Sequence, residues 1–169
     1  MELDGTPTAV RGIIVPPSEV DRADELAAGT IERGFDGDTD RLRRFVAALV
    51  SALPAGTLVA LRGSAVAGRS FRTGAPFDDH GPGTSDLDIV VLGDEALELF
   101  SDEAKYLGGI NTAPASDDAP WVAPRLEKAR RRAQAIARRP VSIQAQAPWF
   151  LGLRARLQRQ PYVILDRDE

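Results

Sequence analysis

The arrangement of hydrophobic and polar positions along the chain predicts an alternation of strands and helices. Four short runs rich in Val, Ile and Leu have the composition of β-strands. Between Leu42 and Leu53, apolar residues recur every three or four positions, as on the buried face of an amphipathic helix. The predicted strands are residues 58–62, 86–92, 141–146 and 162–165.

Start and stop signals predict the boundaries of the other elements. Ser18 followed by acidic residues is typical of a helix N-terminus, and Gly29 is expected to end that helix. The apolar run 11–17 closes with two prolines and is expected to be an edge strand or an extended arm. The predicted helices are residues 19–28, 40–53, 94–107, 124–139 and 149–160, and the predicted loops are residues 65–85 and 109–123, the latter with Trp121 as a packing anchor.

This order of elements predicts an α/β fold, with a small mixed β-sheet of about four strands and helices mainly on one face. With 169 residues, of which 43% are hydrophobic, the chain is long enough for one domain with a substantial core. We therefore expect a single domain over residues 1–169, with residues 1–38 as an N-terminal extension.

Two carboxylates, Asp86 and Asp88, stand at the head of one predicted strand. Because side chains alternate along a strand, both point to one face of the sheet, while Leu87 and Ile89 point to the other. Like charges this close repel each other, and a divalent cation that takes oxygen ligands commonly binds between such carboxylates and compensates the repulsion. Asp86 and Asp88 are therefore candidate ligands of Mg²⁺ or Mn²⁺.

A second polar feature, Gly63–Ser64, lies where the predicted strand 58–62 turns into a short helix. Glycine lets the backbone approach a ligand closely, and a serine hydroxyl beside helix-start N–H groups favours a phosphate. A turn that binds phosphate, next to a carboxylate pair that binds metal, suits a nucleoside triphosphate (NTP) with its metal ions.

Gly63–Ser64 followed by Asp86–Leu87–Asp88 resembles the GS…DxD signature of the DNA polymerase β-like nucleotidyltransferase superfamily. The order helix, strand and GlySer turn is also similar to the family's opening, and the chain is similar in size to its minimal members. The resemblance implies that Asp86 and Asp88 hold Mg²⁺ and that Gly63 and Ser64 hold the terminal phosphates of an NTP, with ATP as the expected nucleotide. Asp86, Asp88 and Ser64 are then the catalytic residues.

The loop 65–85 is longer than in minimal members of the family. Loops beside a site often recognise the substrate or close over it, and a solvated flap is the alternative. Arg69 and Arg72 are candidates for contacts with the triphosphate, because a guanidinium matches phosphate oxygens and balances charge in the transition state. His80, the only histidine of the sequence, is either a general base or a surface residue.

A second departure lies on the predicted strand 141–146, which by order of elements corresponds to the family's strand with a third carboxylate. Its polar face offers Ser142, Gln144 and Gln146, and no acid. An amide cannot act as the base and is a weaker metal ligand than a carboxylate. Three explanations stay open: the reaction needs no third acid, the chain binds nucleotide without catalysis, or an acid of the long loop takes its place. The loop acids are Asp78 and Asp79.

The net charge of −4 conceals an uneven distribution. Residues 1–40 contain ten acidic and three basic side chains, whereas residues 124–140 contain seven basic and one acidic. The basic helix 124–139 is either a solvated face or a surface for a polyanion such as tRNA or for an acidic partner protein. No aromatic residues are interleaved there, which weakens the nucleic-acid alternative.

No apolar run approaches the roughly 20 residues of a membrane-spanning helix, and the acidic start 1–5 lacks the pattern of a signal peptide. We therefore expect a cytoplasmic protein without a membrane partner. The sequence has no cysteine, which excludes disulfides and thiolate metal sites.

The function predicted from these features is transfer of a nucleoside monophosphate from an NTP to an acceptor hydroxyl on a protein, an RNA or a small molecule, with release of pyrophosphate. The alternative is a nucleotidyltransferase-like binding protein that has lost its third acid. A third possibility is an unrelated α/β domain in which Gly63–Ser64 and the two aspartates do not meet.

Overall fold

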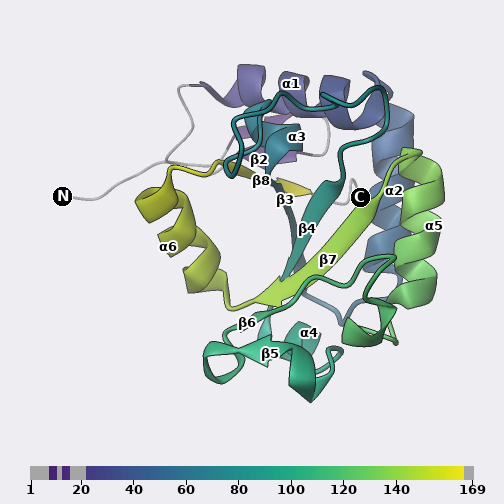
Figure 1. Ribbon diagram of the computed structural model, residues 1–169, viewed down its shortest axis with the longest axis vertical. Helices are drawn as coiled ribbons and strands as arrows, with labels where there is room; N and C mark the ends of the chain where they lie inside the picture. The colour runs from purple at the N-terminus through teal and green to yellow at the C-terminus, as the bar shows by residue number, and fades with distance from the viewer. Residues whose placement is uncertain (1–7, 11–12, 16–21, 166–169) are drawn as a thin grey trace.

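The chain forms one mixed β-sheet flanked by helices, in a computed structural model that describes residues 8–10, 13–15 and 22–165 (Figure 1). The strands of the described residues are β1 (Thr8–Val10), β2 (Ile13–Val15), β3 (Leu58–Arg62), β4 (Leu87–Leu92), β5 (Lys105–Tyr106), β6 (Asn111–Thr112), β7 (Val141–Gln146) and β8 (Tyr162–Leu165). The helices are α1 (Ala23–Phe35), α2 (Thr39–Val50), α3 (Ser64–Ala67), α4 (Asp94–Leu97), α5 (Glu127–Ala137) and α6 (Pro148–Gln158), with short 3₁₀ helices at Asp102–Ala104, Leu107–Gly109 and Pro120–Val122.

The predicted α/β class is confirmed, but the sheet is wider than predicted. Its eight described strands follow the order β1-β2-β8-β3-β4-β7-β6-β5. The four predicted strands are the inner β8, β3, β4 and β7, and the added strands β1, β2, β5 and β6 have only two or three residues each. Such short strands show no alternation that a sequence pattern could reveal. The run 11–17, expected to be an edge strand or an extended arm, contains β2, but β2 pairs with both β1 and β8 and so does not lie at the edge of the sheet.

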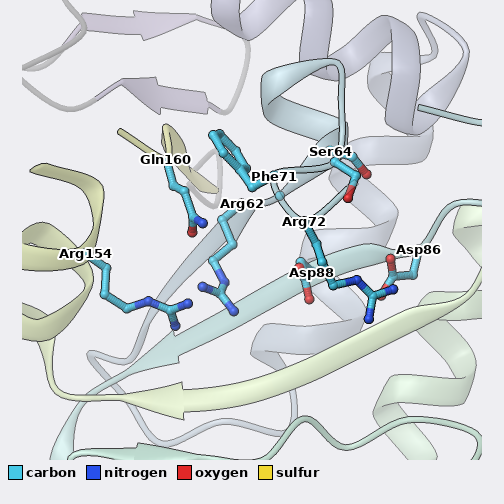
Figure 2. A pocket seen from close by; sticks show the side chains of 10 residues that line it. Arg62, Ser64, Phe71, Arg72, Asp86, Asp88, Arg154 and Gln160 are labelled. Atoms are coloured by element: carbon cyan, nitrogen blue, oxygen red, sulfur yellow. The ribbon is translucent and has the colours of Figure 1, made fainter. Parts of the chain in front are cut away.

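The centre of the sheet brings the motif strands side by side. β4 pairs with β3 in antiparallel register and with β7 in parallel register. Arg62 at the end of β3 lies opposite Asp88 of β4 (Figure 2). On the other side of β4, Asp88 lies opposite Ser142 of β7. β7, whose polar face offers no acid, is therefore the direct neighbour of the carboxylate strand.

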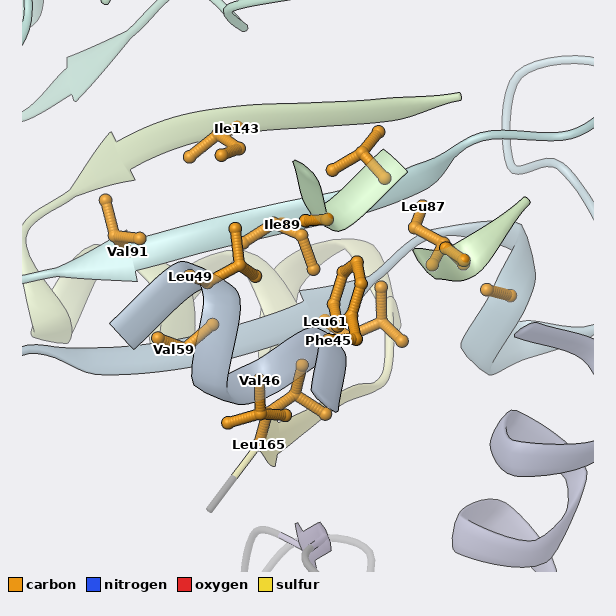
Figure 3. Close-up of a cluster of buried hydrophobic side chains, with 14 of the residues drawn as sticks. Phe45, Val46, Leu49, Val59, Leu61, Leu87, Ile89, Val91, Ile143 and Leu165 are labelled. Carbon is orange, nitrogen blue, oxygen red and sulfur yellow. The ribbon is translucent and has the colours of Figure 1, made fainter. Parts of the chain in front are cut away.

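Each face of the central strands has its own hydrophobic cluster. On one face, Phe45 and Leu49 of α2 belong to the main core with Leu61 and Ile89 (Figure 3). On the other face, Leu151 of α6 packs in a smaller cluster. Its strand members are Ala60, Val90 and Leu92. Asp88 shares this second face with Val90, because side chains alternate along β4. The main core also includes Ile13, Leu26 and Phe35 from the predicted N-terminal extension 1–38.

The prediction that Gly29 ends the first helix is wrong. The predicted start at Ser18 lies outside the described residues, and α1 runs from Ala23 through Gly29 to Phe35. The Arg33 side chain folds back over the helix, so that a Cβ at Gly29 would lie 2.9 Å from Arg33 Nη1. Gly29 therefore makes room for this guanidinium, which donates hydrogen bonds to two carbonyls of α3. The acceptors are Ala65 O and Val66 O.

The helix predicted over 94–107 begins at Asp94 as expected, but its predicted end is wrong, because α4 ends at Leu97. The Ser101 N–H donates to Val122 O at 2.8 Å, and its hydroxyl donates to Trp121 O at 2.6 Å. These long-range bonds replace the helical ones, and the chain continues into β5 and β6, the latter within the predicted loop 109–123. Trp121 is 54% exposed and is not the predicted packing anchor, since its neighbour Val122 is buried instead.

The basic helix predicted over 124–139 is α5, and its positive surface is smaller than the sequence suggests. Arg130 is 1% exposed and donates to carboxylates of Asp117 and Glu127. Arg139 is also buried. The exposed basic side chains are Arg125, Lys128, Arg131, Arg132 and Arg138. Across the described ranges, no helix combines the length and the apolar character needed to span a bilayer.

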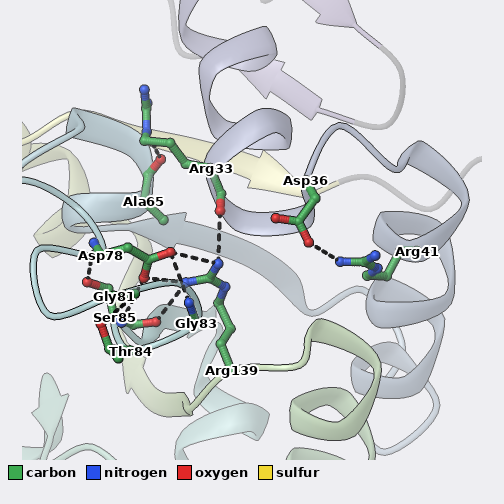
Figure 4. A network of polar contacts seen from close by, with 10 residues as sticks. All are labelled: Arg33, Asp36, Arg41, Ala65, Asp78, Gly81, Gly83, Thr84, Ser85 and Arg139. Carbon is green, nitrogen blue, oxygen red and sulfur yellow. Dashed lines mark hydrogen bonds and ion pairs between the residues drawn. The ribbon is translucent and has the colours of Figure 1, made fainter.

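A network around Arg139 fixes the long loop 65–85 to the rest of the fold (Figure 4). Arg139 Nη1 donates to Asp78 Oδ1 at 2.9 Å, and Nη2 donates to Asp78 Oδ2 at 3.2 Å and to Arg33 O at 3.1 Å. The Phe77 ring centroid lies 4.7 Å from the Arg139 guanidinium carbon. Partial burial alone would raise the pKa of Asp78, but hydrogen bonds from Arg139 and from the N–H groups of Ser85 and Gly83 lower it.

Substitution of Asp78 by Ala should lower the free energy of unfolding by about 3 kcal/mol, because it leaves the buried Arg139 guanidinium without its carboxylate. Denaturant unfolding monitored by circular dichroism measures this loss. Asp102→Ala is the matched control, since Asp102 pairs with Lys105 on the surface, and its unfolding should match the wild type. Equal stability of the Asp78 and Asp102 variants would show that the pair does not hold the loop.

Candidate functional site

The GlySer turn and the carboxylate pair meet in one cleft, a cavity of about 370 Å³ beside the end of β3 and the start of β4 (Figure 2). Gly63, Ser64, Asp86 and Asp88 all line it. Arg72 of the long loop lines it as well, together with Ser70 and Phe71. Residues far apart in the sequence thus converge as the motif spacing predicted.

Gly63 allows this close approach. Its φ is +80°, a conformation that residues with a side chain rarely adopt. A Cβ at Gly63 would also lie 2.9 Å from Asp88 Oδ2. Glycine therefore lets the chain turn from β3 into α3 directly against the carboxylate, and Ser64 begins α3 at the rim of the cleft.

Asp86 and Asp88 converge on a single hydroxyl. Ser142 Oγ lies 2.8 Å from Asp88 Oδ1 and 3.3 Å from Asp86 Oδ2. One hydroxyl proton serves only one of these acceptors at a time, so the two carboxylates remain only partly compensated. Partial burial raises the pKa of Asp86, and the negative charge of Asp88 raises it further. The pair is therefore electrostatically strained in the absence of a cation.

The chemistry of this donor set fits a divalent cation. The two carboxylates and the Ser64 side chain line a polar cavity that leaves room for water and phosphate oxygens, the ligands that complete a Mg²⁺ shell. No cluster of three or more His, Cys, Asp or Glu side chains suited to a metal occurs within residues 8–10, 13–15 and 22–165. A metal here would consequently depend on its substrate for part of its coordination.

No acid of the described loop replaces the third carboxylate. Ser142 occupies the place beside Asp88, while Gln144 and Gln146 are buried further along β7. Asp78 accepts hydrogen bonds at both carboxylate oxygens and belongs to the Arg139 network. The remaining loop candidates, Asp79 and His80, are exposed and are not among the residues that line the cleft.

The two arginines predicted to contact the triphosphate have different positions. Arg72 reaches into the cleft in front of Asp86 and Asp88 (Figure 2). Arg69 is exposed, forms an isolated β-bridge with Pro76 and is not among the residues that line the cleft. Only Arg72 is therefore placed to contact a ligand held between Ser64 and the carboxylates.

Four polar residues of the cleft were not predicted from the sequence: Arg62, Ser70, Arg154 and Gln160. Arg62 directly precedes Gly63 and shares the face of Asp88, so strand alternation could have identified it. Arg154 lies on α6 and Gln160 follows that helix. No sequence signal connects them to the motifs, since the return of α6 over the sheet is a tertiary feature.

Substitution of Asp86 by Asn should stabilise the protein at neutral pH in metal-free buffer. The pKa of Asp86 is raised on folding, so wild-type stability falls as pH rises from the ordinary carboxyl range through the folded-state pKa. Asn lacks this titration, and its advantage should shrink as pH falls toward the ordinary carboxyl pKa of about 4 and should be lost below it. Denaturant unfolding at about pH 7 and about pH 4 measures the difference. Asp94→Asn, an exposed carboxylate after β4, should show no gain, and a D86N variant less stable than wild type at neutral pH would contradict the repulsion.

Comparison with known proteins leaves the cleft to be interpreted from its own residues. No family model, no curated protein and no solved structure matches the chain. The geometry of Gly63, Ser64, Asp86 and Asp88 is therefore the basis on which a function is assigned below.

Proposed function

We propose that the chain is a metal-dependent nucleotidyltransferase of the DNA polymerase β-like type, which transfers a nucleoside monophosphate from an NTP, with ATP as the expected nucleotide, to an acceptor hydroxyl. The observation that supports the proposal is the shared cleft of the GlySer turn and the two aspartates. A phosphate-binding turn and a metal-binding carboxylate pair are the two parts that phosphoryl transfer chemistry needs at one place.

Each residue of the cleft has a role in the proposed reaction. The acceptor oxygen forms a bond to the α-phosphorus, and the bond from that phosphorus to the β-phosphate oxygen breaks, which releases pyrophosphate. Ser64 and the Gly63 backbone would hold the terminal phosphates, and Arg72 would balance their charge. Asp86 and Asp88 would hold Mg²⁺ or Mn²⁺, which when bound neutralises the charge of the phosphates.

Ser142 favours a second candidate function, a nucleotide-binding protein without transfer chemistry. A hydroxyl cannot take the acceptor's proton near neutral pH as a carboxylate can. Its hydrogen bonds to Asp86 and Asp88 place it where a third acid would contact the same ligand. Binding of NTP without release of pyrophosphate would identify this candidate.

We propose that the acceptor hydroxyl belongs to a partner protein, an RNA or a small molecule. The exposed basic residues of α5 would suit tRNA or an acidic partner. However, α5 contributes to the main core, on the face of the sheet opposite Asp88. A polyanion on the exposed face of α5 would therefore bind on the other side of the sheet from Asp88.

Substitution of Asp86 and of Asp88 by Ala should each lower transfer by about a thousandfold, because each removes a ligand of the metal that neutralises the phosphates. The measurement is pyrophosphate release and incorporation of label from each of the four NTPs, with Mg²⁺ or Mn²⁺, in cell lysate. A labelled protein or RNA band obtained only with wild type identifies the acceptor class.

Asp94→Ala is the control for this assay, since Asp94 lies exposed in α4, beyond the opposite end of β4 from the cleft. It should retain wild-type transfer. Unchanged turnover in D86A and D88A would show that these two aspartates do not take part in the reaction. If the wild type shows no turnover, titration calorimetry with NTP and metal is the next measurement. Binding would identify a nucleotide-binding protein, and no binding would show that the cleft does not bind nucleotide.

Substitution of Ser142 by Asp should create the missing third carboxylate. Three acids at one place repel each other, so we expect S142D to be less stable than wild type in metal-free buffer and to gain more thermal stability from Mn²⁺. If the chain is a transferase, S142D should also release pyrophosphate faster. Ser142→Asn, which adds bulk without charge, is the matched control. Equal gains from Mn²⁺ in S142D, S142N and wild type would show that residue 142 does not contact the metal.

A further inference from the structure

Arg62 is a half-buried cation that lies opposite Asp88 and has an unsatisfied hydrogen-bond donor. Its Nε is buried and has no hydrogen-bond acceptor, and within the described residues its guanidinium forms no ion pair. Burial lowers the pKa of Arg62, and the charge of Asp88 opposes that shift without closing an ion pair. An arginine remains ionised in proteins, so its burial without a counter-ion is costly.

The other buried arginines of the fold show the contrast. Arg130 donates to the carboxylates of Asp117 and Glu127. Arg139 donates to Asp78, and Arg41 donates to Asp36. Each of these cations therefore forms an ion pair, whereas Arg62 forms none within the described residues, although Asp88 lies opposite it on β4. A bound anion is the simplest counter-ion for a guanidinium that faces an open cleft.

A second guanidinium faces Arg62 across the cleft. Arg154 extends from α6 toward it (Figure 2). The Arg154 charge lowers the pKa of Arg62 further, as expected for two like charges at close range. α6 is fixed by Leu151, which packs in the smaller core cluster one helical turn before Arg154. The only hydrogen bond that Arg154 makes within the described residues is a 3.4 Å contact from Nε to Gln158 Oε1. Its remaining N–H donors are available to a ligand.

We propose that Arg62, Arg154 and Gln160 form a binding subsite for a phosphate or diphosphate group. Two guanidinium forks that approach from different elements match the several oxygens of a phosphate, and the Gln160 amide, which points to the same part of the cleft, adds a neutral donor (Figure 2). The subsite lies on the opposite side of Asp88 from Asp86 and Arg72. It goes beyond the proposed function, because binding there requires neither transfer chemistry nor a metal.

The phosphate could come from two sources. It could be the terminal phosphates of the NTP, or it could be a phosphate on the acceptor, in which case the acceptor would be a nucleotide or a nucleic-acid end. Both sources present the same chemistry to the two guanidinium groups, so the first experiment uses pyrophosphate alone.

Titration calorimetry of the full chain with pyrophosphate, in buffer with chelator and without divalent metal, tests the subsite. Wild type should bind with one site, and R62Q and R154Q should each weaken binding about 10- to 100-fold, the effect of losing hydrogen bonds to a charged group. R156Q is the matched control, because Arg156 is exposed on the same helix and is not among the residues that line the cleft. It should bind as wild type does.

Thermal unfolding by circular dichroism verifies that each variant is folded, and R154Q on the helix surface keeps the test valid if R62Q is unstable. Wild-type affinity in folded R154Q, or no binding of pyrophosphate to wild type, would overturn the proposal.

Repetition of the titration with a saturating non-hydrolysable ATP analogue and Mg²⁺ then identifies the source of the phosphate. Displacement of pyrophosphate identifies the NTP tail, and simultaneous binding identifies the acceptor phosphate. If the analogue does not bind, the proposed function fails while the pyrophosphate result stands.

Discussion

The position of β4 between an antiparallel and a parallel neighbour is the constraint on which the cleft depends. The register with β3 sets Arg62 beside Asp88, and the register with β7 sets Ser142 on the other side. A shift of one residue would turn Asp88 into the main core and Ile89 toward the cleft, which burial of the apolar face forbids. The hydrophobic core therefore fixes the order of charges across the sheet as firmly as the hydrogen bonds do.

Arginine has two different roles in this structure. Arg33 and Arg139 connect elements distant in sequence, and every such connection ends on carbonyl or carboxylate oxygens. Together they hold α1, α3 and the long loop around the GlySer turn (Figure 4). Arg62 and Arg154 instead face the cleft and form no ion pair within the part of the chain that the structure describes. Position relative to the cavity, rather than residue type, separates the structural cations from those available to a ligand.

The cleft combines features that each oppose folding. Asp86 and Asp88 repel each other, and the Nε of the half-buried Arg62 has no hydrogen-bond acceptor. Structures retain such unfavourable groups where a ligand compensates them, which is why perturbed ionisable groups concentrate in binding sites. A cation between the carboxylates and an anion between the arginines would compensate both, and a metal–nucleotide complex carries both charges.

Local pattern in the sequence was enough to predict the four inner strands, the α/β class and the residues Gly63, Ser64, Asp86 and Asp88, because alternation and turn chemistry act between near neighbours. The other features depended on contacts between distant residues. Ser101 leaves the helical path because Val122 O accepts its N–H, and Gly29 stays in α1 because Arg33 needs its space. In the same way, Arg139 is removed from the basic surface by Asp78, and Arg154 enters the cleft because α6 packs over the second face of the sheet. The sequence by itself determined which chemical groups the chain possesses and which strand presents them, whereas only the tertiary structure decided which charges neutralise one another and which remain for a ligand.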